Sequence, residues 1–305
     1  MLEIKNITKS FGTNHVLKGV SLSLGAGEIY GLIGKNGAGK TTLMNIVSQV
    51  FSADSGSVFL DGKEIKSQND LMGKLGYIID IPAGFDYLTA GEYLEFLTSP
   101  MKLSKDERAT LISATLALVN LDSAKDKRIK KFSRGMKQRL GIAAGLVFDP
   151  EVIIMDEPSS ALDPEGRLEV LKIIESLKSR GKTILLSTHI LNDVERICDR
   201  IGLMVGGQIV VEGNTQEIMN KYAESAIVVE CPADVRENLK EALGSLDFVT
   251  DVTAVPMGLE IKYTDGAKQK VFESVSVMCP LITSIHVKKA SIEDIFIFEN
   301  SKEVK

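Results

Sequence analysis

Residues 34–41 of the chain read Gly34-Lys35-Asn36-Gly37-Ala38-Gly39-Lys40-Thr41. An apolar run that predicts a buried strand precedes them, and a segment typical of a helix start follows from Thr42. In that context the glycines let successive backbone N–H groups face phosphate oxygens, and the helix N-terminus adds the positive end of its dipole. We expect Lys40 to reach the β- and γ-phosphates and the Thr41 hydroxyl to ligate Mg²⁺. A plain glycine-rich turn is the alternative, but it leaves the Lys-Thr pair unexplained, so the stretch predicts a nucleoside triphosphate site.

Length and composition limit the class of protein. The chain has 305 residues, 44% hydrophobic and 25% charged, which is ordinary for globular proteins and long enough for two domains. A net charge of −5 disfavours binding to nucleic acid through bulk charge. The N-terminus has no signal-peptide pattern, and no apolar run is long enough to span a bilayer. We therefore expect any work at a membrane to be done through a partner.

The order of patterns along the chain predicts an α/β fold. Residues 1–30 alternate apolar and polar side chains in short runs, which predicts antiparallel strands, and residues 56–62 predict a further hairpin. Residues 87–122 carry apolar side chains at helical spacing. Over residues 140–211, apolar strands alternate with helices, which is the signal for βα units on a mostly parallel sheet.

A second domain is predicted after a seam near residues 221–225, where the earlier pattern stops. The expected domains are residues 1–222 and residues 226–305. The order of elements in the second domain is βαββαβ, which suits a small α+β ferredoxin-like fold. Its expected elements are strand 226–230, helix 234–243, strands 248–254 and 258–263, helix 267–277, strand 281–287 and a last helix from Ser291.

A second phosphate motif is formed by the apolar run of residues 152–155 and the two acidic residues that follow it, Asp156 and Glu157. A buried strand places such carboxylates at the sheet edge where open α/β sheets bind ligands. We expect Asp156 to hold Mg²⁺, and Glu157 to polarise the attacking water or act as general base. An apolar strand that ends in acids is common by itself, so the motif gains its meaning from the phosphate loop before it.

The segment 132–139, Phe132-Ser133-Arg134-Gly135-Met136-Lys137-Gln138-Arg139, carries the family resemblance. With the motifs above, it resembles the ATP-binding-cassette (ABC) ATPases, which place a Ser-x-Gly signature between the two phosphate motifs. The resemblance implies a P-loop ABC ATPase core with an antiparallel β subdomain and a helical subdomain. It also implies a head-to-tail homodimer with two ATP molecules, in which Ser133 and Gly135 cap the γ-phosphate held by the other subunit. A simple helix N-cap is the alternative for Ser-x-Gly alone. The segment departs from the commonest signature at Phe132, Arg134 and Met136.

Four further positions match the family one by one. The resemblance implies that Phe11 stacks on adenine, that Val16 touches the base, that Asp163 reaches across the dimer and that His189 senses the γ-phosphate. A core aromatic and a structural histidine are the alternatives for Phe11 and His189. The expected catalytic residues are Lys40, Glu157 and His189. The expected nucleotide-binding set is Phe11, Val16, Gly34, Lys35, Asn36, Gly37, Ala38, Gly39, Lys40, Thr41, Thr42, Ser133, Gly135 and Asp163. The expected Mg²⁺ ligands are Thr41, Asp80 and Asp156.

One of these ligands departs from the family. Asp80 stands where the family normally has Gln, or Glu in some branches, after the strand that follows the hairpin. Aspartate is an oxygen ligand suited to Mg²⁺, but it is one methylene shorter than Glu, which favours contact through water.

The single cassette and the trailing domain look most like exporter ATPases that pair with a separately encoded integral membrane permease. That branch includes bacterial drug, antibiotic-peptide and polysaccharide exporters. The resemblance thus implies a cytoplasmic protein, peripheral on the inner face of the cell membrane, with no nucleic-acid partner. The alternative is a soluble ABC ATPase that acts on ribosomes or DNA. It is disfavoured because ribosome-acting members usually carry two cassettes, and because the stretch between Lys40 and Ser133 has no room for the coiled coil of DNA-repair members.

Overall fold

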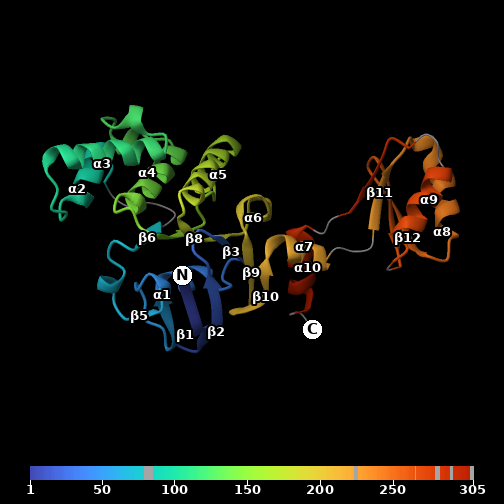
Figure 1. Ribbon diagram of the computed structural model, residues 1–305, viewed down its shortest axis with the longest axis horizontal. Helices are drawn as coiled ribbons and strands as arrows, with labels where there is room; N and C mark the ends of the chain where they lie inside the picture. Colours follow the sequence, from blue (N-terminus) through green and yellow to red (C-terminus); the bar gives the residue numbers. More distant parts are fainter. Residues whose placement is uncertain (79–84, 223–225, 265, 279–281, 289–290, 303–305) are drawn as a thin grey trace. The chain divides into compact units, whose positions relative to one another are not determined.

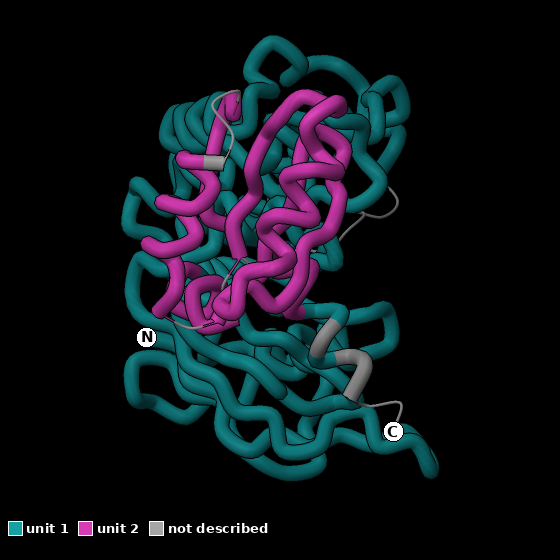
Figure 2. Tube along the Cα trace, turned by 90° about the vertical axis from the view of Figure 1, so that its right-hand side faces the viewer, with its two compact units in different colours: residues 1–215, 296–305 teal, residues 216–295 magenta. Residues whose placement is uncertain are grey.

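The computed structural model describes all residues except 79–84, 223–225, 265, 279–281, 289–290 and 303–305 (Figure 1). The described chain forms two compact units, which Figure 2 colours teal and magenta. The first contains residues 1–215 with the C-terminal segment from Phe296, and the second contains residues 216–295. We describe each unit by itself.

The first unit begins with a four-stranded antiparallel sheet in the order β2-β1-β4-β5. It confirms the strands expected over residues 1–30 and the hairpin at 56–62. Alternate side chains of β1 and β2 are buried, so one face of this sheet packs into the core with α1. The strands are β1 (Leu2–Phe11), β2 (Asn14–Leu24), β4 (Ser55–Leu60) and β5 (Lys63–Ile65).

The second sheet of this unit has six strands in the order β10-β9-β3-β8-β7-β6. All neighbours pair in parallel except β9 and β10, which confirms the mostly parallel sheet. The phosphate loop follows β3, so it lies at the edge where β7 and β8 also end. The strands are β3 (Ile29–Ile33), β6 (Leu75–Ile78), β7 (Val152–Asp156), β8 (Thr183–Thr188), β9 (Arg200–Val205) and β10 (Gln208–Asn214).

Helices of the first unit fall into two groups. Helix α1 packs against β7, whereas α2, α3 and α4 contact one another and form a helical subdomain, green in Figure 1. Thr89, Ser104 and Ser133 begin these three helices, and each side chain accepts the N–H of the third helical residue. The helices are α1 (Lys40–Val47), α2 (Ala90–Thr98), α3 (Lys105–Leu118), α4 (Arg134–Leu146), α5 (Pro164–Ser179) and α6 (Leu191–Ile197), with α7 (Thr215–Tyr222) at the boundary of the two units.

Helix α4 lies directly on β6, because glycines face each other at the contact. A Cβ on Gly76 would overlap the carbonyl oxygen of Gly145, and a Cβ on Gly145 would lie 2.5 Å from Cγ1 of Ile78. Contacts this short do not occur between real side chains, so backbone meets backbone here. The helix that begins with the signature is thus seated on the strand that precedes residue 79.

The second unit is the expected ferredoxin-like fold. Its four strands form an antiparallel sheet in the order β12-β13-β11-β14, and α8 and α9 connect them in the βαββαβ sequence. An apolar core that includes Ile227, Leu239, Ile261 and Val271 joins the sheet to these helices. The elements are β11 (Ala226–Glu230), α8 (Arg236–Gly244), β12 (Val249–Val255), β13 (Gly258–Tyr263), α9 (Lys268–Met278), β14 (Ser284–Val287) and α10 (Ile292–Lys302), the last of which ends in the first unit.

No helix in the described ranges is both long enough and apolar enough to cross a bilayer. The described cysteines Cys198 and Cys231 are buried. Burial and the nearby carboxylates of Asp199 and Asp193 raise the pKa of the Cys198 thiol far above its ordinary value. This thiol therefore stays protonated and packs as a small apolar group.

Candidate nucleotide-binding site

A cavity of about 460 Å³ opens beside the phosphate loop. It brings together side chains that lie far apart in the sequence, from the end of β1 to the residue after β7. The Phe11 side chain, at the end of β1, is 48% exposed. Its ring packs edge-to-face with the ring of Phe51, and the two ring centroids are 6.0 Å apart. The residues that line the cavity are Phe11, Asn14, Val16, Asn36, Gly37, Gly39, Lys40, Thr41, Thr42 and Glu157.

Gly39 lets the loop turn into α1. Its φ is +109°, and an added Cβ would lie 2.8 Å from Cδ2 of Leu17 and 3.1 Å from the carbonyl oxygen of Val16. A side chain would therefore be strained by the backbone and would clash with β2. The chain can begin the helix at Lys40 only because this position is glycine.

Lys40 is 5% exposed, and its ammonium group is held at the loop. Nζ donates to the carbonyl oxygens of Gly34 at 2.7 Å and Lys35 at 3.3 Å, and it lies 3.6 Å from Oε1 of Glu157. The loop directly follows β3 (Ile29–Ile33), whose residues are all buried, so its first residue is held by the sheet. The buried Lys40 ammonium group thus lies between the loop backbone and the Glu157 carboxylate, where it can bind a phosphate group.

Glu157 is the centre of a hydrogen-bonded group at the ends of β7 and β8. Its backbone N–H donates to the carbonyl oxygen of Ser187 at 3.2 Å and to the Ser187 hydroxyl at 3.0 Å. Its Oε2 lies 2.7 Å from Nδ1 of His189. The backbone of Glu157 has φ +51°, which side chains adopt at a cost, and such strain is common in functional loops.

Asp156 pairs in register with Ser187 and is 9% exposed at the end of β7. The Ser187 hydroxyl donates to its Oδ1, so Ser187 connects Asp156 to the Glu157 backbone. Nearby, the Tyr77 hydroxyl donates to Oδ1 of Asn45 at 3.1 Å. Burial, with the charge of Asp156, raises the pKa of Tyr77 to about 12. Tyr77 is therefore a neutral donor beside the acidic strand end.

Six described residues of the expected nucleotide-binding set do not line this cavity. Three of them, Gly34, Lys35 and Ala38, belong to the phosphate loop itself, and the other three, Ser133, Gly135 and Asp163, lie in other segments. Ser133 is exposed at the N-terminus of α4, where its hydroxyl accepts the Met136 N–H at 3.2 Å. Gly135 lies in the first turn of the same helix. Asp163 is exposed and caps α5 by accepting the Gly166 N–H at 3.2 Å. These last three occupy helix N-termini on the surface of the chain. Asp80, the remaining expected ligand, lies outside the described residues.

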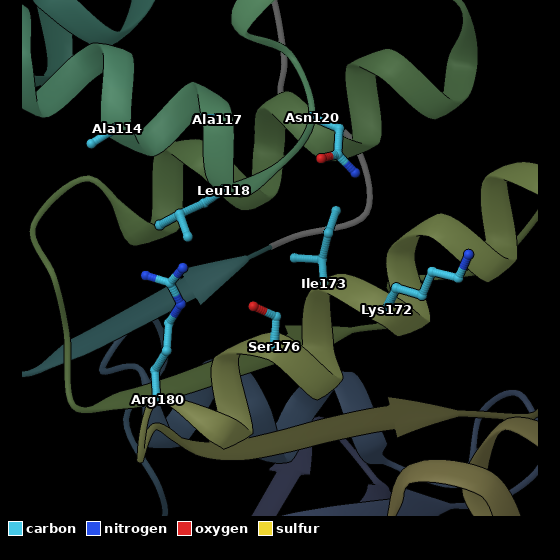
Figure 3. A pocket seen from close by; sticks show the side chains of 8 residues that line it. All are labelled: Ala114, Ala117, Leu118, Asn120, Lys172, Ile173, Ser176 and Arg180. Carbon is cyan, nitrogen blue, oxygen red and sulfur yellow. The ribbon is translucent and has the colours of Figure 1, made fainter.

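A separate cavity, also of about 460 Å³, lies between α3 and α5 (Figure 3). The Arg180 guanidinium approaches Leu118, while the Lys172 side chain turns away from Arg180. None of the residues described as lining it belongs to a phosphate motif. Its lining residues are Ala114, Ala117, Leu118, Asn120, Lys172, Ile173, Ser176 and Arg180. The cavity at Lys40 is therefore the candidate nucleotide site.

Two site residues were missed in the sequence analysis. Asn14 lines the cavity from the first position of β2, directly after a turn, and asparagines beside turns are too common to be singled out. Ser187 lies within the buried strand β8, where a small polar side chain gives no periodic signal. Only its register beside Asp156 reveals its role.

The sheet, the phosphate loop and the acidic strand end define a P-loop nucleotide-binding protein. Residues 17–160 match the family described as ABC transporter. The bacitracin transport ATP-binding protein BcrA of Enterococcus faecalis is 38% identical over 97% of this chain and 95% of its own length. The linearmycin resistance ATP-binding protein LnrL of Bacillus subtilis is 33% identical over 97% of each chain. The chain therefore belongs to the ABC transporter family, as one of its ATP-binding and ATP-hydrolysing subunits.

A solved structure shares both fold and sequence with the first unit. It is the ATP-binding cassette MJ0796, as a dimer in a post-hydrolysis state bound to ADP and Pi. The similarity has a TM-score of 0.64 at 26% identity and covers 70% of this chain and 99% of that one. The expected α/β cassette fold is thus confirmed.

Proposed function

We propose that two copies of the chain close head to tail around two ATP molecules and power export through a separate membrane permease. The observation that carries this proposal is the division of the expected site within one chain. Lys40 and Glu157 line the cavity, whereas Ser133 and Gly135 lie in an exposed helix N-terminus, which suits phosphate from another subunit. The dimeric state of the similar cassette MJ0796 supports this arrangement.

Within each composite site we assign the following roles. Phe11 and Val16 contact the adenine, since an exposed aromatic face at the cavity can stack on a base. The backbone of residues 34–42 and the Lys40 ammonium hold the phosphates. Glu157 orients the attacking water, and His189 contacts both Glu157 and the γ-phosphate. Ser133, Gly135 and Asp163 come from the partner subunit.

Mg²⁺ is the metal that these residues fit. No three His, Cys, Asp or Glu side chains in the described part of the chain form a cluster that could hold a metal ion alone. Mg²⁺ keeps several waters and binds through one or two carboxylates plus substrate phosphates, which suits the Thr41 hydroxyl and Asp156. We retain Asp80 as a further ligand through water. Bound there, Mg²⁺ neutralises phosphate charge.

Similarity over the full length supports the proposed membrane partner and the proposed class of exported substrate. BcrA and LnrL match beyond the cassette, so residues 1–222 act in this proposal as the ATP-binding domain and residues 226–305 as an accessory domain. Both names refer to antibiotics, and we extend export of an antibiotic to this chain. The protein would then be peripheral on the cytoplasmic face of the cell membrane.

The direct test is to purify the chain from solubilised membranes of its own cells and assay Mg²⁺-dependent ATP hydrolysis. We expect a permease to copurify and ATP to be hydrolysed by the complex. Recovery of ribosomes or DNA in place of a membrane protein would contradict the export function.

The composite site predicts complementation between two inactive chains. A Lys40→Ala chain retains Ser133, and a Ser133→Arg chain retains Lys40, so their heterodimer has one complete site. We expect the ATPase activity of the mixture to exceed the sum of the two parents, measured by phosphate release at equal total protein. Activity that never exceeds that sum would contradict the head-to-tail dimer.

Ser104→Arg is the matched control for this experiment. Ser104 also caps an exposed helix of the same subdomain, accepting the Glu107 N–H at 3.3 Å. Loss of either cap costs about 1 kcal/mol of stability. We expect Ser104→Arg alone to hydrolyse ATP normally, so inactivity of Ser133→Arg would reflect contact with nucleotide rather than a frayed helix.

We propose that the permease docks on the segment from residue 80 to residue 131. In its described part, Phe85 packs against Tyr93 and Phe96 with ring centroids 5.1 and 5.5 Å apart. Tyr87 is 67% exposed and Phe96 is 56% exposed, which is unusual for large aromatic side chains. Lys125, Lys127 and Arg128 lie near the C-terminal end of the segment.

Cysteine crosslinking tests this docking surface. Tyr87→Cys and Phe96→Cys should crosslink to the copurified permease, because both side chains already reach solvent. Lys172→Cys, exposed on α5, should not. The unsubstituted chain controls for native cysteines. Crosslinking from position 172 but from neither aromatic position would place the permease on α5 and contradict the proposed docking segment.

A further inference from the structure

The connections that follow β7 and β8 meet at one buried carboxylate that has no role in the mechanism above. Asp193, in the first turn of α6, is 3% exposed. The Ser159 hydroxyl, also 3% exposed, donates to its Oδ2 at 2.8 Å. Arg167 approaches from α5 and donates from Nε to Oδ1 at 2.7 Å, with Nη2 at 2.6 Å from the same oxygen.

The two partners of Asp193 come from the two ends of the connection between β7 and α5. Ser159 follows Glu157 and Pro158 in the turn after β7. Arg167 lies in the first turns of α5, and its N–H donates at 2.9 Å to the carbonyl oxygen of Asp163, the cap of that helix. Asp193 itself lies one helical turn after His189. One carboxylate therefore joins the β7–α5 connection, which carries Glu157 and Asp163, to the β8–α6 connection, which carries His189.

Loss of any one of the hydrogen bonds to Asp193 would be energetically costly. A buried carboxylate is tolerated when it is paired and hydrogen-bonded, and removal of one partner leaves an uncompensated group. Both oxygens of Asp193 are used, one for the hydroxyl and one for the guanidinium. The arrangement holds Glu157 and His189 within 2.7 Å of each other from two separate strand ends.

We infer that Asp193 is a positioning residue of the ATPase site, which fixes the connection that carries Glu157 and Asp163 against the connection that carries His189. This inference rests on the roles proposed above for those residues. Asp193 does not touch nucleotide itself, since it is buried behind the loops. By holding these segments, Asp193 aligns the side chains that position the attacking water, and it aligns the surface around Asp163 that faces the partner subunit. Small misplacement of aligned groups slows a reaction far more than it weakens ground-state binding.

The test compares Asp193→Ala, Asp193→Asn and the unsubstituted protein in steady-state ATP hydrolysis and in direct ATP binding. We expect Asp193→Ala to lower kcat by about 10- to 100-fold while KM and the ATP affinity change by about 2-fold or less. Asparagine can still accept from Arg167 and bond to the Ser159 hydroxyl, which can reverse its donor role. Asp193→Asn should therefore restore most of kcat.

Glu175→Ala is the matched control, because it removes a whole carboxylate side chain as Asp193→Ala does. Glu175 of α5 accepts at 3.2 Å from Arg196 of α6, so this pair joins the same two helices, but both side chains are about 40% exposed. We expect its loss to leave kcat and KM unchanged. A drop equal to that of Asp193→Ala would show that any loosening between α5 and α6 suffices, and would overturn the inference.

Ser159→Ala keeps the test decisive if Asp193→Ala does not fold. It removes one bond from the same carboxylate and should lower kcat with KM unchanged. Wild-type kcat in Ser159→Ala and in folded Asp193 variants would refute the positioning role while leaving the ATPase function intact. No hydrolysis by the unsubstituted complex would instead refute the proposed function itself.

Discussion

Glu157→Gln should lower kcat by about 100-fold or more, because a positioned carboxylate that assists proton transfer contributes about 10²- to 10⁴-fold. The glutamine side chain has the same shape and can keep a hydrogen bond to His189 and the backbone bonds to Ser187. ATP affinity should stay close to that of the unsubstituted chain. Because ATP binds without being consumed, the variant should also accumulate as an ATP-bound dimer, which size-exclusion chromatography would detect.

Glu151→Gln provides the control for Glu157→Gln. Glu151 is exposed just before β7, at the opposite end of the same strand. The identical chemical change there should leave turnover unaltered. Normal turnover in Glu157→Gln would remove Glu157 from its assigned role and leave the water to another group.

Lys40→Ala should weaken ATP binding by about 10- to 100-fold, the effect of losing a charge-assisted hydrogen bond of roughly 1.5–3 kcal/mol. The side chain is 5% exposed and has its ammonium group at the loop already, so little is spent on reorganisation when phosphate arrives. Fluorescent ATP titration measures the affinity. Turnover should fall too, since the same charge faces the γ-phosphate in the transition state.

Lys105→Ala checks that this loss is specific. Lys105 is exposed at the start of α3, away from the cavity residues, and its removal changes the net charge equally. We expect unchanged affinity. If both variants lost affinity alike, general electrostatic attraction would explain the binding better than the loop does.

Local sequence was sufficient to predict those parts of the site that one segment builds by itself. The phosphate loop needs only β3, Gly39 and Lys40 in succession, because its geometry is set by the backbone of adjacent residues. The same holds for the strand that ends in Asp156 and for the βαββαβ order of the second unit, where hydrophobic periodicity reflects burial.

Long-range contacts could not be predicted in this way. Ser187 matters because strand register sets it beside Asp156, and Asp193 because α6 packs on α5. Neither residue has a neighbour in sequence that reveals its partner. Residues assigned to the partner subunit, such as Ser133, stay predictions because a single chain shows only a helix cap there.

The glycine contact between α4 and β6 has a consequence for mutational tolerance. Elsewhere in α4 a substitution can be absorbed by rotamer changes of neighbouring side chains, but at Gly76 and Gly145 the obstacle is main chain or a buried isoleucine. Even alanine would wedge the helix away from the strand, and the signature at the start of that helix would tilt with it. Two positions that carry no chemistry therefore tolerate little besides glycine, and we expect substitutions there to lower activity through the displaced helix.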